Sequence, residues 1–107
     1  MTMVTNLQHF LDENGEVPTD LTSEAEALLS FLSLVVEAAT MAYDKPATFA
    51  SAPCRAIVEG KPCEGQIETW VYAETNEIGW ECLDCEEEGV ITGWEKTVWD
   101  RRDYVRH

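Results

Sequence analysis

The chain has 107 residues and a formal net charge of −14, from 21 acidic and 7 basic side chains. With 45% hydrophobic residues and four tryptophans it is too apolar to be disordered, and it is too short for most multidomain enzymes. The charge also disfavours direct binding to nucleic acid, because such binding comes mainly from Lys and Arg contacts to phosphate. The acidity favours solubility, or an acidic surface that recognises a basic protein or mimics nucleic acid.

The sequence contains no evident targeting signal. Residues 1–9 lack the basic segment and the long apolar segment of a secretory signal. The longest apolar stretch, around Val35 and Val36, is interrupted by Ser33 and Glu37, which leaves it shorter than the roughly 20 residues of a membrane span. We therefore expect a protein of the reducing cytoplasm with no membrane association.

Residues 1–50 contain no cysteine and no tryptophan and are expected to form a helical region. A first helix is predicted over residues 6–14, because Leu7, Phe10 and Leu11 follow the i, i+3, i+4 spacing of an amphipathic helix. Together with a second, longer helix it would form a helical hairpin.

The second helix is predicted over residues 23–43. Ser23 and Glu26 match the S-x-x-E capping box, and Pro46 ends the helix. Apart from one narrow polar stripe, its surface is apolar; the stripe consists of Glu26, Ser30, Ser33, Glu37, Thr40 and Asp44. Such a helix must be buried on most sides, either within the monomer or in a homodimer formed through this helix.

Residues 51–107 are expected to form strands and turns, after a proline-bounded linker at 44–53. Alternation of apolar and polar side chains over 67–74 predicts a strand with Ile67, Thr69 and Val71 on one face. A second strand contains Ile78, Trp80 and Cys82 on one face, and a third covers 90–94. We predict a small antiparallel sheet of three strands. The tryptophans on or beside these strands are expected to pack its core and dock the apolar helix; they are Trp70, Trp80, Trp94 and Trp99.

The four cysteines carry the chemistry of the sequence. Their spacing is Cys54-x8-Cys63, then eighteen residues, then Cys82-x2-Cys85. The second pair fits a zinc knuckle, in which two thiolates face one ion about 2.3 Å away, and the gap fits a hairpin that brings the first pair to the same ion. The x8 spacing is longer than that of an ordinary knuckle, so the intervening segment is expected to loop out and return Cys63 to the site. Gly65 is expected to supply permissive backbone for the turn.

Other uses of the cysteines are two disulfides, which a reducing compartment opposes, and a redox-active Cys82–Cys85 pair. Neighbouring acidic side chains oppose the redox pair because they raise thiol pKa values; they are Glu81, Asp84, Glu86, Glu87 and Glu88. His9 and His107 are alternative metal ligands that lie far from the cysteines in sequence. We favour a structural zinc ion bound by Cys54, Cys63, Cys82 and Cys85, because four thiolates leave no coordination position for a reacting water.

Two stretches of the sequence carry a resemblance. They are Cys63-x-Gly65-x-Ile67 and Trp80-x-Cys82-x2-Cys85-x3-Gly89-Val90-Ile91-x2-Trp94-x2-Thr97-x-Trp99-Asp100. Residues 54–100 thereby resemble a zinc-ribbon-like segment of bacterial proteins of uncharacterised function. The resemblance implies a cysteine-bound zinc ion and a small β-ribbon, and it implies no activity.

The sequence thus predicts an α+β protein in which an N-terminal helical hairpin packs on a small antiparallel zinc-ribbon-like sheet. Residues 1–50 and 51–107 would form one compact unit. Because the sequence contains no glycine-rich phosphate loop, nucleophile elbow or H-E-x-x-H motif, we expect no enzyme. We expect a zinc-binding protein-interaction module whose protein partner is unidentified. The alternatives are a nucleic-acid-associated or transcription-related zinc-ribbon factor and a thiol redox protein that uses Cys82 and Cys85.

Overall fold

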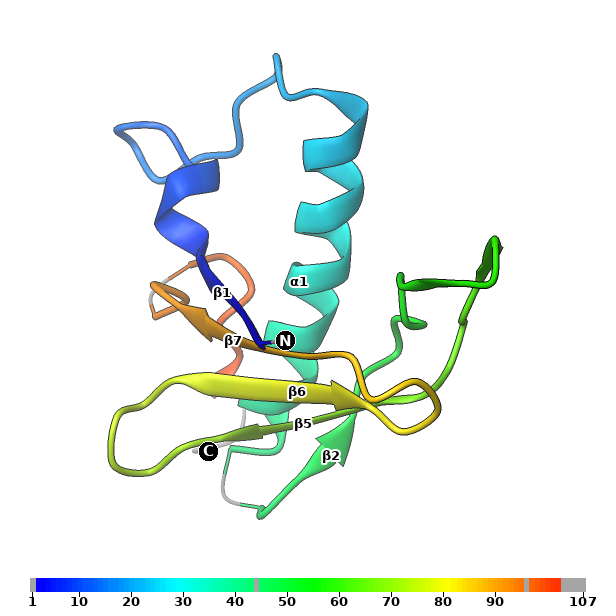
Figure 1. Ribbon diagram of the computed structural model, residues 1–107. Helices are drawn as coiled ribbons and strands as arrows, with labels where there is room; N and C mark the ends of the chain where they lie inside the picture. The colour runs from blue at the N-terminus through cyan, green and yellow to red at the C-terminus, as the bar shows by residue number, and fades with distance from the viewer. Residues whose placement is uncertain (1, 44, 96, 103–107) are drawn as a thin grey trace.

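One long helix and two β-sheets make up the described residues, 2–43, 45–95 and 97–102, of this computed structural model (Figure 1). Five strands form the larger sheet in the order β1-β7-β6-β5-β2. Their bounds are Thr2–Asn6 for β1, Thr48–Phe49 for β2, Ile67–Val71 for β5, Ile78–Cys82 for β6 and Glu88–Thr92 for β7. The other elements are the helix α1 (Ser23–Met41), the 3-10 helix η1 (Leu7–Phe10) and the hairpin of β3 (Ile57–Val58) with β4 (Lys61–Pro62). The chain is α+β, as the sequence predicts.

The strands β5, β6 and β7 form an antiparallel meander, which confirms the three antiparallel strands predicted from the sequence. Thr69 pairs with Trp80, and Trp80 pairs with Gly89 on the next strand. Ile67 and Ile78 are fully buried, as expected for the apolar positions of an alternating pattern. Two strands that the sequence does not predict extend the meander: β1 runs parallel to β7, and β2 runs antiparallel to β5. The strand β2 lies inside the segment predicted to be a linker.

The helix predicted over residues 6–14 is wrong. The chain forms β1 up to Asn6 and then a single short 3-10 helix, whose first turn is capped by the Asn6 side chain accepting from the Gln8 N–H group at 2.9 Å. The spacing of Leu7 and Phe10 fits one 3-10 turn as well as an α-helix. The strand β1 pairs with β7, and this pairing satisfies backbone groups that a short isolated helix would leave unpaired. The pairing therefore favours a strand followed by a 3-10 turn over an α-helix. The described residues therefore contain no N-terminal helical hairpin.

The helix α1 confirms the predicted second helix, with small changes at its ends. Its N-cap is Thr22, whose hydroxyl accepts from the Ala25 N–H group at 3.1 Å, one residue before the predicted capping residue Ser23. Seven of its side chains are buried, among them Thr40 from the predicted polar stripe. Among the described residues, no helix has both the length and the apolarity needed to cross a membrane. Burial of α1 against the sheet accounts for much of its apolar surface, and dimerisation through it stays a prediction.

The tryptophans divide between the core and the opposite face of the sheet. Trp80 packs edge-on against Phe31 of α1, with ring centroids 5.1 Å apart, and Trp94 is fully buried with its indole N–H group donating to the Asn76 carbonyl at 2.8 Å. Trp99 is half-buried against the same core. Trp70 points away from α1 and is half-buried, so the expected packing role holds for three of the four.

Candidate metal centre

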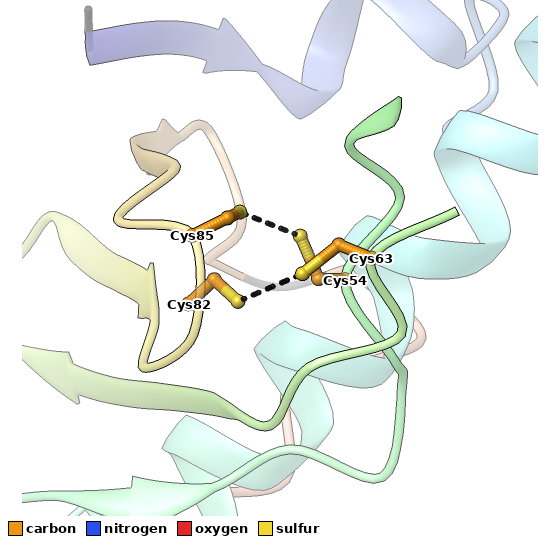
Figure 2. A group of neighbouring side chains, drawn as sticks. All are labelled: Cys54, Cys63, Cys82 and Cys85. Atoms are coloured by element: carbon orange, nitrogen blue, oxygen red, sulfur yellow. Dashed lines mark hydrogen bonds between the residues drawn. The ribbon is translucent and has the colours of Figure 1, made fainter. Parts of the chain in front are cut away.

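The four cysteine side chains meet at one end of the β5–β6 hairpin. Their Sγ atoms all lie within 4.8 Å of one another, so the group can hold a metal ion. Cys54 and Cys63 come from the two ends of the β3–β4 hairpin, whereas Cys82 ends β6 and Cys85 lies in the turn that follows (Figure 2). Cysteines 19 and 31 positions apart in sequence are thus brought into contact by two separate arms of the chain.

The sulfur positions fit a tetrahedral ion. The Sγ atoms of Cys54 and Cys85 are 3.6 Å apart, and those of Cys63 and Cys82 are 3.7 Å apart. Four ligands 2.3 Å from a central zinc ion would have sulfurs about 3.8 Å from one another. All four cysteines are free thiols. Both short contacts join one arm to the other, so an ion at the centre would hold the two arms together.

The two arms position their first cysteine in the same way. The Ala56 N–H group donates to Cys54 Sγ at 3.4 Å, and the Asp84 N–H group donates to Cys82 Sγ, also at 3.4 Å. In both arms the donor therefore belongs to the second residue after the cysteine. Such N–H donors stabilise a thiolate, which is the form that binds a metal. Sequence reasoning missed these two residues because a backbone donor leaves no signature in residue type.

The residue after the second cysteine also has the same conformation and the same hydrogen bond in both arms. Glu64 follows Cys63, and Glu86 follows Cys85; both are left-handed, with φ of 54° and 64°. Their N–H groups donate to the carbonyls of the first cysteine in each arm, at 3.3 Å for Glu64 and 3.2 Å for Glu86. The two arms are therefore two copies of one knuckle geometry.

This correspondence explains the x8 spacing. The N–H group of Cys63 donates to the Ala56 carbonyl at 2.8 Å, which closes a hairpin formed by residues 57–62. At its tip, Glu59 and Gly60 have φ of 52° and 80°, as a tight two-residue hairpin turn requires. Without these six residues the first pair would also read C-x2-C. The predicted loop that returns Cys63 to the site is confirmed, and it is a β-hairpin inserted into an ordinary knuckle.

Gly65 has a different role from the one predicted. Its φ is not in the left-handed region, where the neighbouring Glu64 lies instead. A Cβ atom on Gly65 would lie 2.6 Å from Cys82 Sγ and 2.7 Å from a carboxylate oxygen of Asp84. The glycine is needed because the backbone of one arm passes directly against the sulfur of the other.

Burial and hydrogen bonding move the thiol pKa values in opposite directions. Burial raises the pKa of Cys54 to about 12. Burial also acts to raise the pKa of Cys82, but N–H groups of Cys85 and Asp84 and the thiols of the other arm donate to this sulfur, and together they lower its pKa. Without an ion, the thiol of Cys82 thus ionises more readily than an ordinary cysteine and that of Cys54 less readily. A bound cation would favour the thiolate form of all four.

The remaining candidate residues lie outside this cluster. The acidic side chains predicted to surround the second pair are mostly solvated, since Asp84, Glu86, Glu87 and Glu88 are exposed. His9 is exposed on η1 and is not part of the four-residue group. The other histidine considered as a ligand, His107, lies outside the described residues.

Comparisons of the chain with protein-family models, with curated proteins and with solved structures found no match. The resemblance to bacterial zinc-ribbon-like proteins therefore stays an expectation from the sequence. The case for a metal centre rests on the positions of the four sulfurs and the paired knuckle geometry.

Proposed function

We propose that this chain is a zinc-binding, non-enzymatic protein-interaction module whose ion joins the two knuckles. The observation that carries the proposal is that four sulfurs from two arms lie within 4.8 Å of one another. Four thiolates complete a tetrahedral shell and leave no position for a water or a substrate, which is typical of structural zinc sites and not of catalytic ones.

The donor set favours zinc. Tetrahedral sites of four thiolates bind zinc or iron in proteins, and zinc requires no redox partner. Metal analysis separates the two ions directly, and an iron–thiolate centre would also absorb visible light. We expect the chain, purified without added metal, to contain about one zinc ion and no such absorption.

The sulfur distances also bear on the thiol redox alternative. Sγ contacts of 3.6 Å and 3.7 Å join Cys54 to Cys85 and Cys63 to Cys82, so Cys82 and Cys85 each contact a sulfur of the other knuckle. No feature of the described residues favours the nucleic-acid alternative, and the net charge of −14 opposes it. The interaction role is supported by exposed apolar side chains on the hairpin inserted into the first knuckle, where Ile57 is 67% and Val58 46% exposed.

Substitution of single ligands tests the metal centre. Cys54→Ser should weaken zinc binding by more than about 100-fold, since loss of even an outer partner of a metal ligand weakens binding about 10–100-fold. His9→Ala is the matched control and should leave the affinity unchanged, because His9 is exposed and outside the cluster. A stably folded chain that contains no metal and four free thiols would contradict the proposal.

The interaction role is tested by affinity capture from the source cell. The zinc-loaded chain should retain a protein that the Cys54→Ser variant does not retain. Recovery of the same proteins by an unrelated acidic protein of equal charge would show that the binding is only electrostatic, and it would contradict a specific interaction role.

A further inference from the structure

The hairpin of β3 and β4 (residues 57–62) is called the arm from here on, and the two cysteine-bearing segments are called the knuckles. The arm is not needed to position the metal ligands. The second knuckle reaches the same geometry with Cys82-x2-Cys85 alone. All six residues of the arm are exposed, so it adds no buried side chain to the core. In Figure 1 the arm projects beyond the sheet, on the side where β6 ends. An exposed hairpin without a core of its own fits a contact element better than a structural one.

The arm and its flank combine apolar and basic side chains. Val58 and Lys61 pair across the hairpin, so they share one face, and Ile57 pairs with Pro62 on the other. Arg55, just before the arm, and Lys61 are exposed, and neither forms an ion pair with another described residue. Residues 55–62 thus hold two basic residues and one acidic residue, Glu59, on a chain with three acidic residues for each basic one. This segment is therefore locally apolar and slightly basic.

A complementary surface lies at the opposite end of the β5–β6 hairpin. There a hollow of about 600 Å³, here called the acidic hollow, is lined by Tyr72, Ala73, Glu74, Thr75, Glu77 and Val90. The ring of Tyr72 is 43% exposed and is held edge-on against Trp70, with centroids 6.0 Å apart. The hollow therefore offers a fixed aromatic wall, an aliphatic side chain and two carboxylates.

We propose that the arm of one copy of this chain docks in the acidic hollow of a second copy. Ile57 or Val58 would pack against the aromatic and aliphatic wall, and Lys61 and Arg55 would face the carboxylates of Glu74 and Glu77. The choice of a second copy follows from charge complementarity, since both surfaces are present on one chain. This proposal deepens the proposed interaction role and rests on it.

The placement of the two surfaces defines the symmetry of the pair. One arm of six residues in one hollow is a small contact beside the roughly 1,200–2,000 Å² that a stable interface buries. A two-fold axis that sets two chains antiparallel brings each arm to the other chain's hollow, so both contacts form at once. Two chains of −14 repel at long range, and salt screens this repulsion, so association is expected to strengthen from low to physiological ionic strength.

The test is a charge swap measured by sedimentation velocity over a range of concentrations, on full-length chains loaded with zinc. Lys61→Glu and Glu74→Lys should each weaken the dimer about tenfold or more, because each places like charges together. Mixing the two variants should restore a dimer, since one contact of the mixed pair is native and the other is reversed. Lys45→Glu is the control for net charge; Lys45 is exposed and outside both surfaces, and this variant should dimerise like the unaltered chain.

The other outcomes overturn the proposal. A chain that stays monomeric at all concentrations overturns it, and so does a dimer that survives both single variants, which would place the contact elsewhere, as on α1. Mixed variants that remain monomeric also overturn it. Zinc content measured on the same samples separates this failure from failure of the proposed function: a monomer with one zinc ion contradicts only the docking, whereas a chain without metal contradicts the metal centre.

Discussion

The Sγ atom of Cys54 lies 3.6 Å from that of Cys85, although the two cysteines belong to different knuckles. The same crossing joins Cys63 to Cys82 at 3.7 Å. The centre therefore links the two knuckles to each other. These contacts determine which disulfides can form when the ion is removed.

Oxidation of the metal-free chain should join the two knuckles by disulfides. When zinc is removed and a thiol oxidant such as diamide takes two electrons and two protons from each pair, we expect disulfides Cys54–Cys85 and Cys63–Cys82, because these sulfurs are in contact. Peptide mapping by mass spectrometry identifies the linked peptides. Zinc-loaded chains treated in parallel should stay reduced, since the thiolates are coordinated. Predominance of a Cys82–Cys85 disulfide would instead favour the thiol redox alternative.

The parts of this structure that the sequence predicted are those set by local pattern. Alternation along β5 and β6 placed Ile67, Thr69, Ile78 and Trp80 correctly on the buried face, because a strand with one buried side has a period of two. The four cysteines were likewise recognisable as one group, since two cysteines three positions apart are typical ligands of one zinc ion and a second pair completes the set of four.

The parts that were missed depend on contacts between distant segments. The strand β1 exists because Val4 pairs with Val90, and nothing within residues 2–10 distinguishes a strand and a 3-10 turn from a short helix. The role of Gly65 depends on the sulfur of Cys82 in the other knuckle, and no local sequence pattern shows this contact. Conversely, the x8 spacing was the least regular feature of the sequence, and it became interpretable only when the hydrogen bonds around Cys54 and Cys82 could be compared.

Excision of the arm tests whether the first knuckle is an ordinary one with an insertion. Deleting residues 57–62 joins Ala56 to Cys63, which are already hydrogen-bonded at the base of the hairpin. The shortened chain should still bind about one zinc ion per chain and keep its helical circular dichroism, because the arm buries no side chain. Loss of zinc binding, with the rest of the fold intact, would show that the arm does help to position Cys63.

Two adjacent positions in the first knuckle should respond to substitution in opposite directions. Glu64→Gly should raise the free energy of unfolding by about 0.5–1 kcal/mol. A left-handed conformation costs a non-glycine residue about 1–2 kcal/mol, and the gain from glycine is smaller because glycine loses more backbone entropy on folding. Gly65→Ala should lower both stability and zinc affinity, because its Cβ would lie 2.6 Å from Cys82 Sγ. Urea unfolding of zinc-loaded chains measures both, and equal effects of the two variants would contradict the assignment of the strained residue to Glu64.

Zinc affinity should rise with pH through the neutral range. Burial raises the pKa of Cys54 to about 12. At Cys63 the N–H group of Gly65 acts to lower the pKa, but burial and the thiols of Cys85 and Cys82 outweigh it, so the pKa is raised. Both groups are therefore protonated thiols at pH 7 in the metal-free chain, and each must release a proton when the ion binds.

Each such proton contributes up to about tenfold in apparent affinity for each unit of pH below the thiol pKa, so binding strengthens as pH rises and weakens on acidification. Competition with a chelator of known affinity, between about pH 6 and pH 8, measures the slope. Calorimetry in two buffers of different ionisation enthalpy counts the protons independently. An affinity that does not change over this range would mean that these thiols are already ionised, and it would contradict the raised pKa values of Cys54 and Cys63.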